Sequence, residues 1–266
     1  MIEQALYITT TDHLRYMHAD VNRLYFGQEF CERLLPAVGE LREMLAYAAE
    51  RGLSFSLVTP VATDSGLATI EQLMRLLNEE LTEAEVVFND WGVFHLLQEQ
   101  FPACKPVMGR LLNKQKRGPR IMNIIDKVPE PTRRYYQGSN LDVPAAAAFL
   151  KQLGINRVEF DNLLQDTDFN STDLEIHKSL YLPFAFVSTT RFCLTAGCAQ
   201  SENIDRIGVY PCGKECRQLG FALENPVMQV PLIRKGNTVF IVNEHIPDCI
   251  AQNYVDRIVV QPELPL

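Results

Sequence analysis

The cysteines are the residues of this chain whose type and spacing most clearly indicate chemistry. Seven are present, and four of them, Cys193, Cys198, Cys212 and Cys216, follow the spacing C-x4-C-x13-C-x3-C. Free cysteine is often buried as a small apolar residue, but it does not usually cluster in this way. The total is odd and the N-terminal residues lack the basic and apolar pattern of a signal peptide, so disulfide staples are not favoured. The cluster therefore predicts thiolate ligands for a metal centre.

The spacing by itself leaves the metal open. Structural zinc sites favour cysteine pairs separated by two to four residues, and the pairs here fit that range loosely. Iron–sulfur clusters are also held by cysteine thiolates, and their ligands often combine a local group with a distant residue. On the residues alone, a zinc-stabilised scaffold and an iron–sulfur protein are both consistent with the pattern.

A framework in which strands alternate with helices must position these ligands. Apolar residues recur at helical spacing in the segments Ala37–Arg51, Leu67–Leu81, Trp91–Gln100 and Val143–Leu150. The predicted strands are Ala5–Thr9, Arg23–Phe26, Ser54–Thr59, Glu85–Asn89, Lys105–Met108, Arg157–Phe160, Phe184–Ser188 and Arg257–Val260. Such alternation indicates βαβ units and a mainly parallel sheet. We therefore predict an α/β fold, a (β/α)8 TIM-barrel-like domain with irregularities, and keep a doubly wound open sheet as the alternative.

The chain is predicted to form a single domain over residues 1–266, in which three segments depart from the alternation. A cysteine-rich, cluster-binding insertion is expected at about residues 189–220. Val227–Asn243 has the pattern of a C-terminal β-hairpin with a turn around Gly236. Lys114–Gly138, rich in lysine, arginine and proline, is expected to form a long loop.

The barrel prediction also places candidate site residues, because chemistry in such barrels lies at the C-terminal ends of the strands. Cys31 follows the second predicted strand, and the segment of Cys193 follows the seventh, so both are expected at that edge. Asp90 could line a pocket there or cap the following helix. Arg110 could bind a ligand carboxylate. The residues predicted to surround a substrate pocket are Asn89, Asp90, Arg110, Asn113, Glu175, His177 and Arg191.

Composition narrows the classes of function. The formal charge of −8 argues against a surface built as a whole to grip nucleic acid, although the basic segment Lys114–Tyr136 could contact RNA. Hydrophobic residues make up 47% of the chain, which is enough for a sizeable core. Because no run of about eighteen apolar residues is free of charge, we expect no membrane-spanning helix and a cytoplasmic location.

Several motifs resemble a known family. The segments that carry the resemblance are Leu24–Cys31, Phe88–Gly92, Glu175–His177, Leu182–Ala185, Arg191–Cys193 and Asp256–Val260. They resemble the collagenase-like group of peptidase family U, and the similarity extends over most of the chain. Within that family, the chain is most similar to the members that act in oxygen-independent ubiquinone biosynthesis.

The resemblance implies a [4Fe-4S] cluster and its ligands. These relatives hold the cluster on four cysteines, and the matching positions are Cys31, Cys193, Cys212 and Cys216. This chain departs from the pattern in two ways. One extra residue separates Arg191 from Cys193, and Cys198 falls outside the pattern, where it could be an alternative ligand.

The resemblance also implies a reaction. Its relatives take part in oxygen-independent hydroxylation of ubiquinone (prenylquinone) precursors as a heterodimer with a homologous partner subunit, with prephenate implicated as the oxygen donor. We therefore expect a subunit of such a hydroxylase. Hydroxylation of RNA bases, a non-catalytic zinc scaffold and peptide hydrolysis are the alternatives, and the last finds no visible Ser-His-Asp or Cys-His pattern in the sequence.

Overall fold

The framework of the protein is a closed barrel of eight parallel strands, ordered β1-β12-β7-β6-β5-β4-β3-β2. This computed structural model describes residues 2–81, 83–169, 175–200, 202, 208 and 210–266. The barrel strands are β1 (Glu3–Ile8), β2 (Arg23–Gly27), β3 (Ser54–Val58), β4 (Glu85–Phe88), β5 (Lys105–Met108), β6 (Arg157–Asp161), β7 (His177–Leu182) and β12 (Arg257–Val260). The predicted (β/α)8 TIM-barrel-like fold is confirmed, and the open sheet is not.

Alternation along each strand separates the inside of the barrel from its outer face. Leu24 and Phe26 of β2 belong to the large apolar cluster between strands and helices. Tyr25, between them, belongs to the cluster inside the barrel. Because the side-chain period of a strand is two, a shift of one residue would exchange these faces, so burial on both sides fixes the register.

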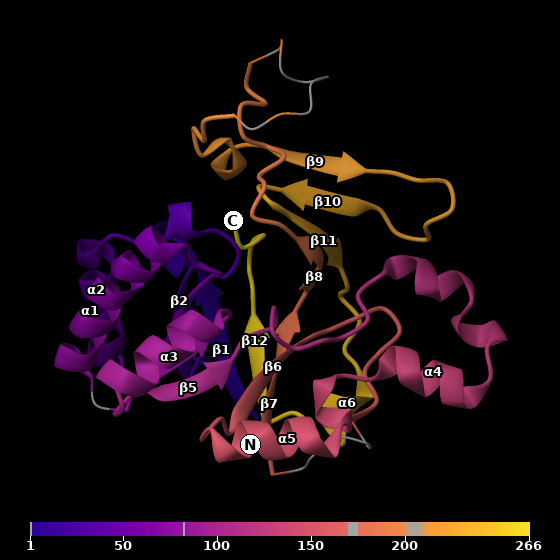
Figure 1. Cartoon of the computed structure of the whole chain (residues 1–266), viewed down its shortest axis with the longest axis horizontal. Helices are drawn as coiled ribbons and strands as arrows, with labels where there is room; N and C mark the ends of the chain where they lie inside the picture. The colour runs from indigo at the N-terminus through magenta and orange to yellow at the C-terminus, as the bar shows by residue number, and fades with distance from the viewer. Residues whose placement is uncertain (1, 82, 170–174, 201, 203–207, 209) are drawn as a thin grey trace.

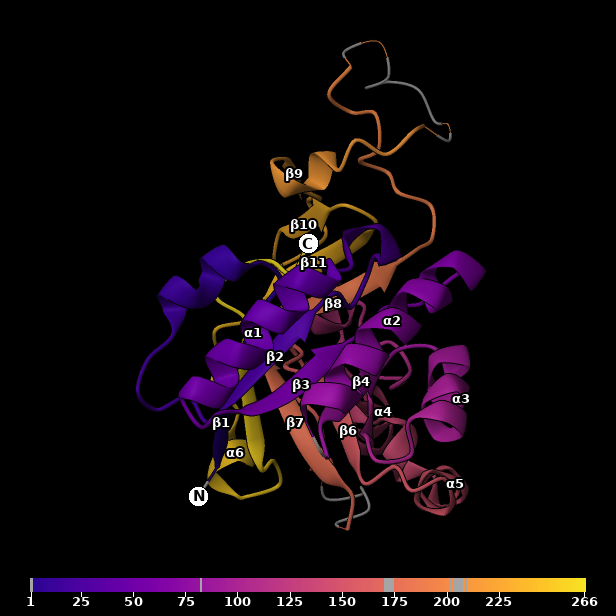
Figure 2. The same ribbon diagram turned by 90° about the vertical axis from the view of Figure 1, so that its left-hand side faces the viewer.

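Helices cover the outside of the barrel, most completely beside β2 to β5 (Figures 1 and 2). The α-helices are α1 (Val38–Glu50), α2 (Asp64–Glu80), α3 (Trp91–Gln100), α4 (Glu130–Gln137), α5 (Pro144–Gln152) and α6 (Asp248–Ala251). Short 3-10 turns are η1 (Thr11–Tyr16), η2 (Glu32–Leu34), η3 (Pro119–Asn123), η4 (Ile125–Lys127), η5 (Asn140–Asp142) and η8 (Glu215–Arg217). In the described part of the chain, no helix has the length and apolar character needed to cross a membrane.

A second sheet stands above the C-terminal end of the barrel (Figure 1). Its four strands have the order β8-β11-β10-β9, and their bounds are Phe184–Thr189, Thr238–Val242, Leu232–Lys235 and Gly220–Leu223. The pairs in this sheet are antiparallel. The chain thus leaves the barrel after β7, builds this sheet together with the cysteine-rich segment, and returns in β12. The predicted C-terminal hairpin is confirmed as β10 and β11.

Two predicted elements are wrong. Phe184–Ser188 is β8 of the upper sheet, and the seventh barrel strand is β7, which had not been predicted. The start of β7 is polar, and Lys178 is nevertheless 3% exposed because its Nζ donates to the Ile176 carbonyl at 2.8 Å. The expected loop Lys114–Gly138 contains η3, η4 and α4. Pro131 suits the first turn of α4, because a proline there removes no helical hydrogen bond.

Candidate metal centre

Cysteines from two separate loops, one after β2 and one between β8 and β9, line one cavity at the C-terminal end of the barrel. The cavity has a volume of about 360 Å³, and its wall includes Cys31, Cys193, Cys212 and Cys216. Cys31 follows β2, Cys193 follows β8, and the other two precede β9. Among the described residues, no three His, Cys, Asp or Glu side chains converge closely enough to bind one metal ion. The thiols therefore surround a space rather than meet at a point.

The turn between β10 and β11 joins these two loops. The Asn237 Nδ2 donates to the Phe30 carbonyl and to the Thr190 carbonyl, both at 2.7 Å. Phe30 directly precedes Cys31, and Thr190 lies in the short segment that leads from β8 to Cys193. One amide side chain thus fixes the approach of residues that are far apart in the sequence.

The same turn packs against a third cysteine. Gly236 adopts a φ of +59°, and a Cβ added there would lie 3.4 Å from the Cys216 Cβ and 3.3 Å from the Leu266 side chain. Cys216, 5% exposed, also belongs to an apolar cluster with Phe30 and Leu266. Only a residue that tolerates a positive φ and lacks a side chain fits this position without strain.

Two carboxylates, Glu215 and Glu32, connect the segments that carry the cavity cysteines to one another or to a neighbouring loop. Glu215 accepts hydrogen bonds from the Gly197 nitrogen at 2.8 Å and from the Gly213 nitrogen at 3.0 Å, so it connects the two ends of the cysteine-rich segment. Glu32, next to Cys31, accepts from the Thr63 nitrogen at 2.6 Å. The loop after β2 is thereby tied to the loop after β3.

Two of the cavity thiols, those of Cys216 and Cys31, lie in an environment that favours their protonated form. Burial, and then the neighbouring cysteines, raise the pKa of Cys216 to about 11. Burial also raises the pKa of Cys31, and Cys193 and Cys212 add to the effect. Metal ligation requires thiolates, so a cationic group in the cavity would have to offset this cost. Four thiols around one space are a suitable donor set for a four-cysteine iron–sulfur cluster or a four-cysteine zinc site.

Cys198 lies outside the described lining of the cavity. Its backbone nitrogen donates to the Thr195 carbonyl at 3.2 Å, within the turn that follows Cys193. Burial raises the pKa of its thiol, and Glu215 and Cys193 raise it further, so the side chain is near the group without being part of its wall.

Arg110, predicted to bind a ligand, is instead satisfied inside the protein. It is 0% exposed and donates to Glu29 at 2.5 Å and to Asp161 at 2.7 Å. Arg117 also pairs with Asp161. The prediction of a free arginine at the pocket, or of a solvated one, is wrong. The Arg110 guanidinium is already paired with Glu29, which follows β2, and with Asp161, which ends β6. Burial alone would lower the pKa of Arg110, but Asp161 and Glu29 raise it.

Three other predicted pocket residues form hydrogen bonds to backbone groups near the C-terminal ends of the strands. Asn89, 1% exposed, donates to the Thr59 carbonyl at 2.9 Å and accepts from the Leu111 nitrogen at 3.0 Å. Asp90 caps α3, accepting from the Gly92 nitrogen at 2.7 Å. The Asn113 Nδ2 donates to the Glu159 carbonyl at 2.9 Å. They do not belong to the described lining of the cysteine cavity, whereas Arg191 does.

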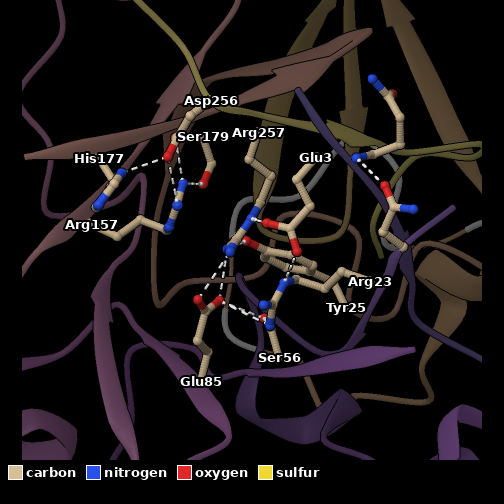
Figure 3. Close-up of polar contacts among 12 residues, drawn as sticks. Glu3, Arg23, Tyr25, Ser56, Glu85, Arg157, His177, Ser179, Asp256 and Arg257 are labelled. Atoms are coloured by element: carbon tan, nitrogen blue, oxygen red, sulfur yellow. Dashed lines mark hydrogen bonds and ion pairs between the residues drawn. The ribbon is translucent and has the colours of Figure 1, made fainter. Parts of the chain in front are cut away.

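Glu175 and His177 lie at the opposite end of the barrel. His177 begins β7, so it is at the N-terminal end of a strand, and its Nδ1 lies 2.6 Å from Asp256 (Figure 3). Glu175 forms an ion pair with Lys151 at 2.5 Å. Neither residue belongs to the described lining of the cysteine cavity, because the N-terminal end of a barrel strand lies opposite the end at which that cavity opens.

The barrel interior contains a polar group that was not predicted. Glu159 on β6 is 0% exposed; it accepts from the Tyr25 hydroxyl at 2.9 Å and also from the Tyr181 hydroxyl. The rings of Tyr7, Tyr25 and Tyr181 lie 6.2 to 6.5 Å apart. A signal existed in the sequence, because Glu159 lies inside the predicted strand Arg157–Phe160 and Asp161, two residues on, faces the same side of the observed β6.

Comparisons with known proteins show the fold. No protein-family model matches the chain, and no curated protein matches it. A solved structure titled "The Structure of the U32 Peptidase Mk0906" aligns with a TM-score of 0.51 and 13% sequence identity. The alignment covers 100% of this chain and 95% of that chain. The chain thus shares its fold with a U32 peptidase along nearly its whole length.

Proposed function

We propose that this protein is a relative of the family U (U32) proteins that binds a [4Fe-4S] cluster on Cys31, Cys193, Cys212 and Cys216. We propose further that it acts as a UbiV-like subunit, with a homologous UbiU-like partner, in oxygen-independent hydroxylation of a ubiquinone precursor. Prephenate is the proposed oxygen donor. The fold shared with a U32 peptidase supports the coarser part of this proposal.

One observation carries the cluster assignment. Cysteines that are remote in sequence, on loops after β2 and β8 and before β9, line the same 360 Å³ cavity. Cysteines kept only as small core residues have no reason to gather around one space from a loop after β2 and from both ends of the β8–β9 connection. Two of the other cysteines lie elsewhere: Cys104 belongs to the main core, and Cys249 packs against it.

The residues around the cavity suit a cluster site. The four thiolates would ligate the iron atoms, and Asn237 and Glu32 would hold their loops in position. Phe30 and Leu34, both buried, would limit access of water from the barrel side. A bound [4Fe-4S] cluster supplies one-electron redox or Lewis-acid chemistry.

Anaerobic purification followed by iron, sulfide and zinc quantification tests the assignment. We expect about four irons and four sulfides per chain in the unmodified protein, as for a cubane held by four cysteines. Cys212→Ser should lose the cluster, and Cys249→Ser is the matched control that should keep it. One zinc per chain without sulfide would replace the cluster by a structural zinc site. Full iron occupancy in Cys212→Ser would refute the ligand set.

The reaction itself needs a separate test. The loaded protein, mixed anaerobically with a UbiU-like partner, prephenate and a prenylphenol precursor, is expected to yield a hydroxylated product. Retention of RNA fragments on a filter, weakening as salt rises, would favour the alternative of RNA-base hydroxylation. Hydrolysis of casein would favour a peptidase, although the ring partners of His13, His95 and His177 are carboxylates rather than a nucleophile.

A further inference from the structure

The interior of the barrel contains three tiers of ionisable side chains. The upper tier, beneath the cysteine cavity, pairs Glu29 and Asp161 with Arg110 and Arg117. The lower tier, near the N-terminal ends of the strands, pairs Glu3 and Glu85 with Arg23 and Arg257 (Figure 3). Each of these tiers balances two carboxylates with two guanidinium groups.

The middle tier is not balanced. Glu159 lies between the other two, and its hydrogen-bond partners are the uncharged hydroxyls of Tyr25 and Tyr181. The described cations nearest to it are already paired: Arg257 binds Glu85 at 2.7 Å, and Arg110 binds Glu29 and Asp161. An ionised Glu159 would therefore be a buried negative charge without a counter-charge, which is costly unless the group takes up a proton.

The groups that face Glu159 from the packed strands act on its pKa in opposite directions. Burial is the largest influence and raises the pKa, and the charge of Glu29 acts in the same direction. The hydroxyls of Tyr181 and Tyr25 and the charge of Arg257 lower it, and the net result is a pKa raised to about 7. Tyr7 on β1 contributes a hydroxyl that is buried and has no hydrogen-bond partner among the described residues. Two tyrosine donors stabilise the carboxylate enough for both protonation states to be accessible near neutrality.

The lower tier restricts where the proton can come from. Arg257 donates to the Tyr25 hydroxyl at 2.6 Å, so Tyr25 must donate its own hydrogen to Glu159. A guanidinium does not release its proton in proteins, so this side cannot relay protons to Glu159. The upper side is different, because the partnerless Tyr7 hydroxyl leaves a buried position where a water molecule could bridge.

The upper side is also the side of the cysteines. Glu29, whose charge acts on Glu159, is two residues from Cys31. The Phe30 ring lines the cavity and lies 5.6 Å from the Arg110 guanidinium carbon. A change of charge in the cavity is therefore transmitted into the barrel through a low-dielectric region, where Coulomb interactions are strong.

We infer that Glu159 is the proton-binding site of this barrel and takes up a proton when the centre in the cysteine cavity gains an electron. In this step an external reductant supplies one electron to the centre, and the Glu159 carboxylate binds one proton from solvent water. The inference rests on the proposed function only for the electron-accepting centre; proton binding by Glu159 itself does not depend on the cluster.

The first test is infrared difference spectroscopy of the protein without its cluster, across about pH 5 to pH 9. We expect the carbonyl band of a buried protonated carboxyl to disappear near pH 7 and to be missing in Glu159→Gln. Glu71→Gln, at a partly exposed position on α2, should leave the band unchanged. If no such band titrates, or if Glu159→Gln retains it, the proton site is overturned.

The second test measures the midpoint potential of the loaded protein against pH with an external one-electron reductant. In the unmodified protein the potential should be level below the pKa that Glu159 has beside the oxidised centre. It should fall as pH rises above that pKa and become level again above the higher pKa that Glu159 has beside the reduced centre, whereas Glu159→Gln should be flat throughout. Coincident profiles would overturn the coupling. Failure to load iron would overturn the proposed function and leave the infrared result standing. If Glu159→Gln does not fold, Tyr181→Phe replaces it, with the infrared titration expected at higher pH.

Discussion

The contacts of the individual cysteines separate those that line the cavity from the one beside it. Cys212 and Cys216 lie in the wall, whereas Cys198 lies in the turn after Cys193 and outside the described lining. A serine at position 198 should leave all cavity thiols in place. The sequence spacing could not make this distinction, because both intervals fall within the range used by metal sites.

The first prediction follows from that distinction. Cys198→Ser is expected to retain at least about nine-tenths of the iron of the unmodified protein, while Cys216→Ser falls below about one-tenth, because a missing thiolate leaves the cluster one ligand short. Iron and sulfide content after anaerobic purification is the readout. Loss of iron in Cys198→Ser would mean that this thiol, rather than Cys31, completes the ligand set.

A second prediction compares two glycines with the same backbone conformation. Gly236 and Gly52 have φ values of +59° and +64°, but an added Cβ meets Cys216 and Leu266 only at Gly236 and nothing within 4 Å at Gly52. Alanine at either site should lower the free energy of unfolding by about 1 kcal/mol through backbone strain. Only Gly236→Ala should also reduce iron content, because it displaces Cys216. Equal iron in both variants would show that this contact does not position the ligand.

Among the elements, the β10–β11 turn is the part of the upper sheet that determines the shape of the cavity. Its Asn237 amide bonds the carbonyls that lead to Cys31 and Cys193. Asn123 offers a matched comparison, since its side-chain amide also donates to a backbone carbonyl, that of Val227, at 2.6 Å. Neither Asn123 nor Val227 belongs to the β10–β11 turn. The two side chains differ in what they connect rather than in chemistry.

The third prediction uses this pair. Asn237→Ala should lower the free energy of unfolding by about 1–3 kcal/mol, because the partly buried Phe30 carbonyl and the exposed Thr190 carbonyl lose their donor. It should also slow or reduce cluster loading. Asn123→Ala should change stability less and loading not at all. Urea unfolding and the rate of iron uptake measure both effects, and unchanged uptake in Asn237→Ala would contradict the assigned role.

Comparison of the predicted and observed helices and strands shows which of them the sequence pattern could predict. Short β-rich runs predicted seven of the barrel strands, because strands buried on both faces are nearly continuously apolar. Helical spacing of apolar residues predicted α3 with its observed bounds. The sequence pattern could not predict β7, whose polar start Lys178 is compensated by a local hydrogen bond. Nor could it predict that Arg110 pairs with Glu29 and Asp161, since these partners meet only when distant strands close the barrel.

For the whole molecule, the ion pairs at the N-terminal end help to close the barrel. Arg257 on the last strand contacts Glu3 on the first and Glu85 on β4 (Figure 3). Burial works to raise the pKa of Glu85, but the hydrogen bond and charge of Arg257 outweigh it and lower that pKa to about 2. A carboxylate with a depressed pKa stabilises the fold above its ordinary pKa, and this contribution is lost as pH falls toward the folded value.

The fourth prediction is an acid-stability test of that network. The unmodified protein should lose about 3 kcal/mol more than Glu85→Gln between about pH 5 and pH 2, since a shift of one pKa unit corresponds to about 1.4 kcal/mol. Glu85→Gln should also be the less stable protein at neutral pH. Glu83→Gln, which removes an exposed partner of Lys105, is the control with little effect. Parallel acid curves for the unmodified protein and Glu85→Gln would contradict the role of the network.

The position of the upper sheet between β7 and β12 has a topological consequence. A metal held by Cys31 and Cys193 would cross-link the chain across about 160 residues, which includes most of the barrel. In the chain-entropy description, closing so long a loop lowers the conformational entropy of the unfolded chain, which stabilises the folded state by about 5 kcal/mol. The bound centre would therefore be a cross-link that can form only after β8 has been synthesised. It would also couple the barrel and the upper sheet, so that they unfold together.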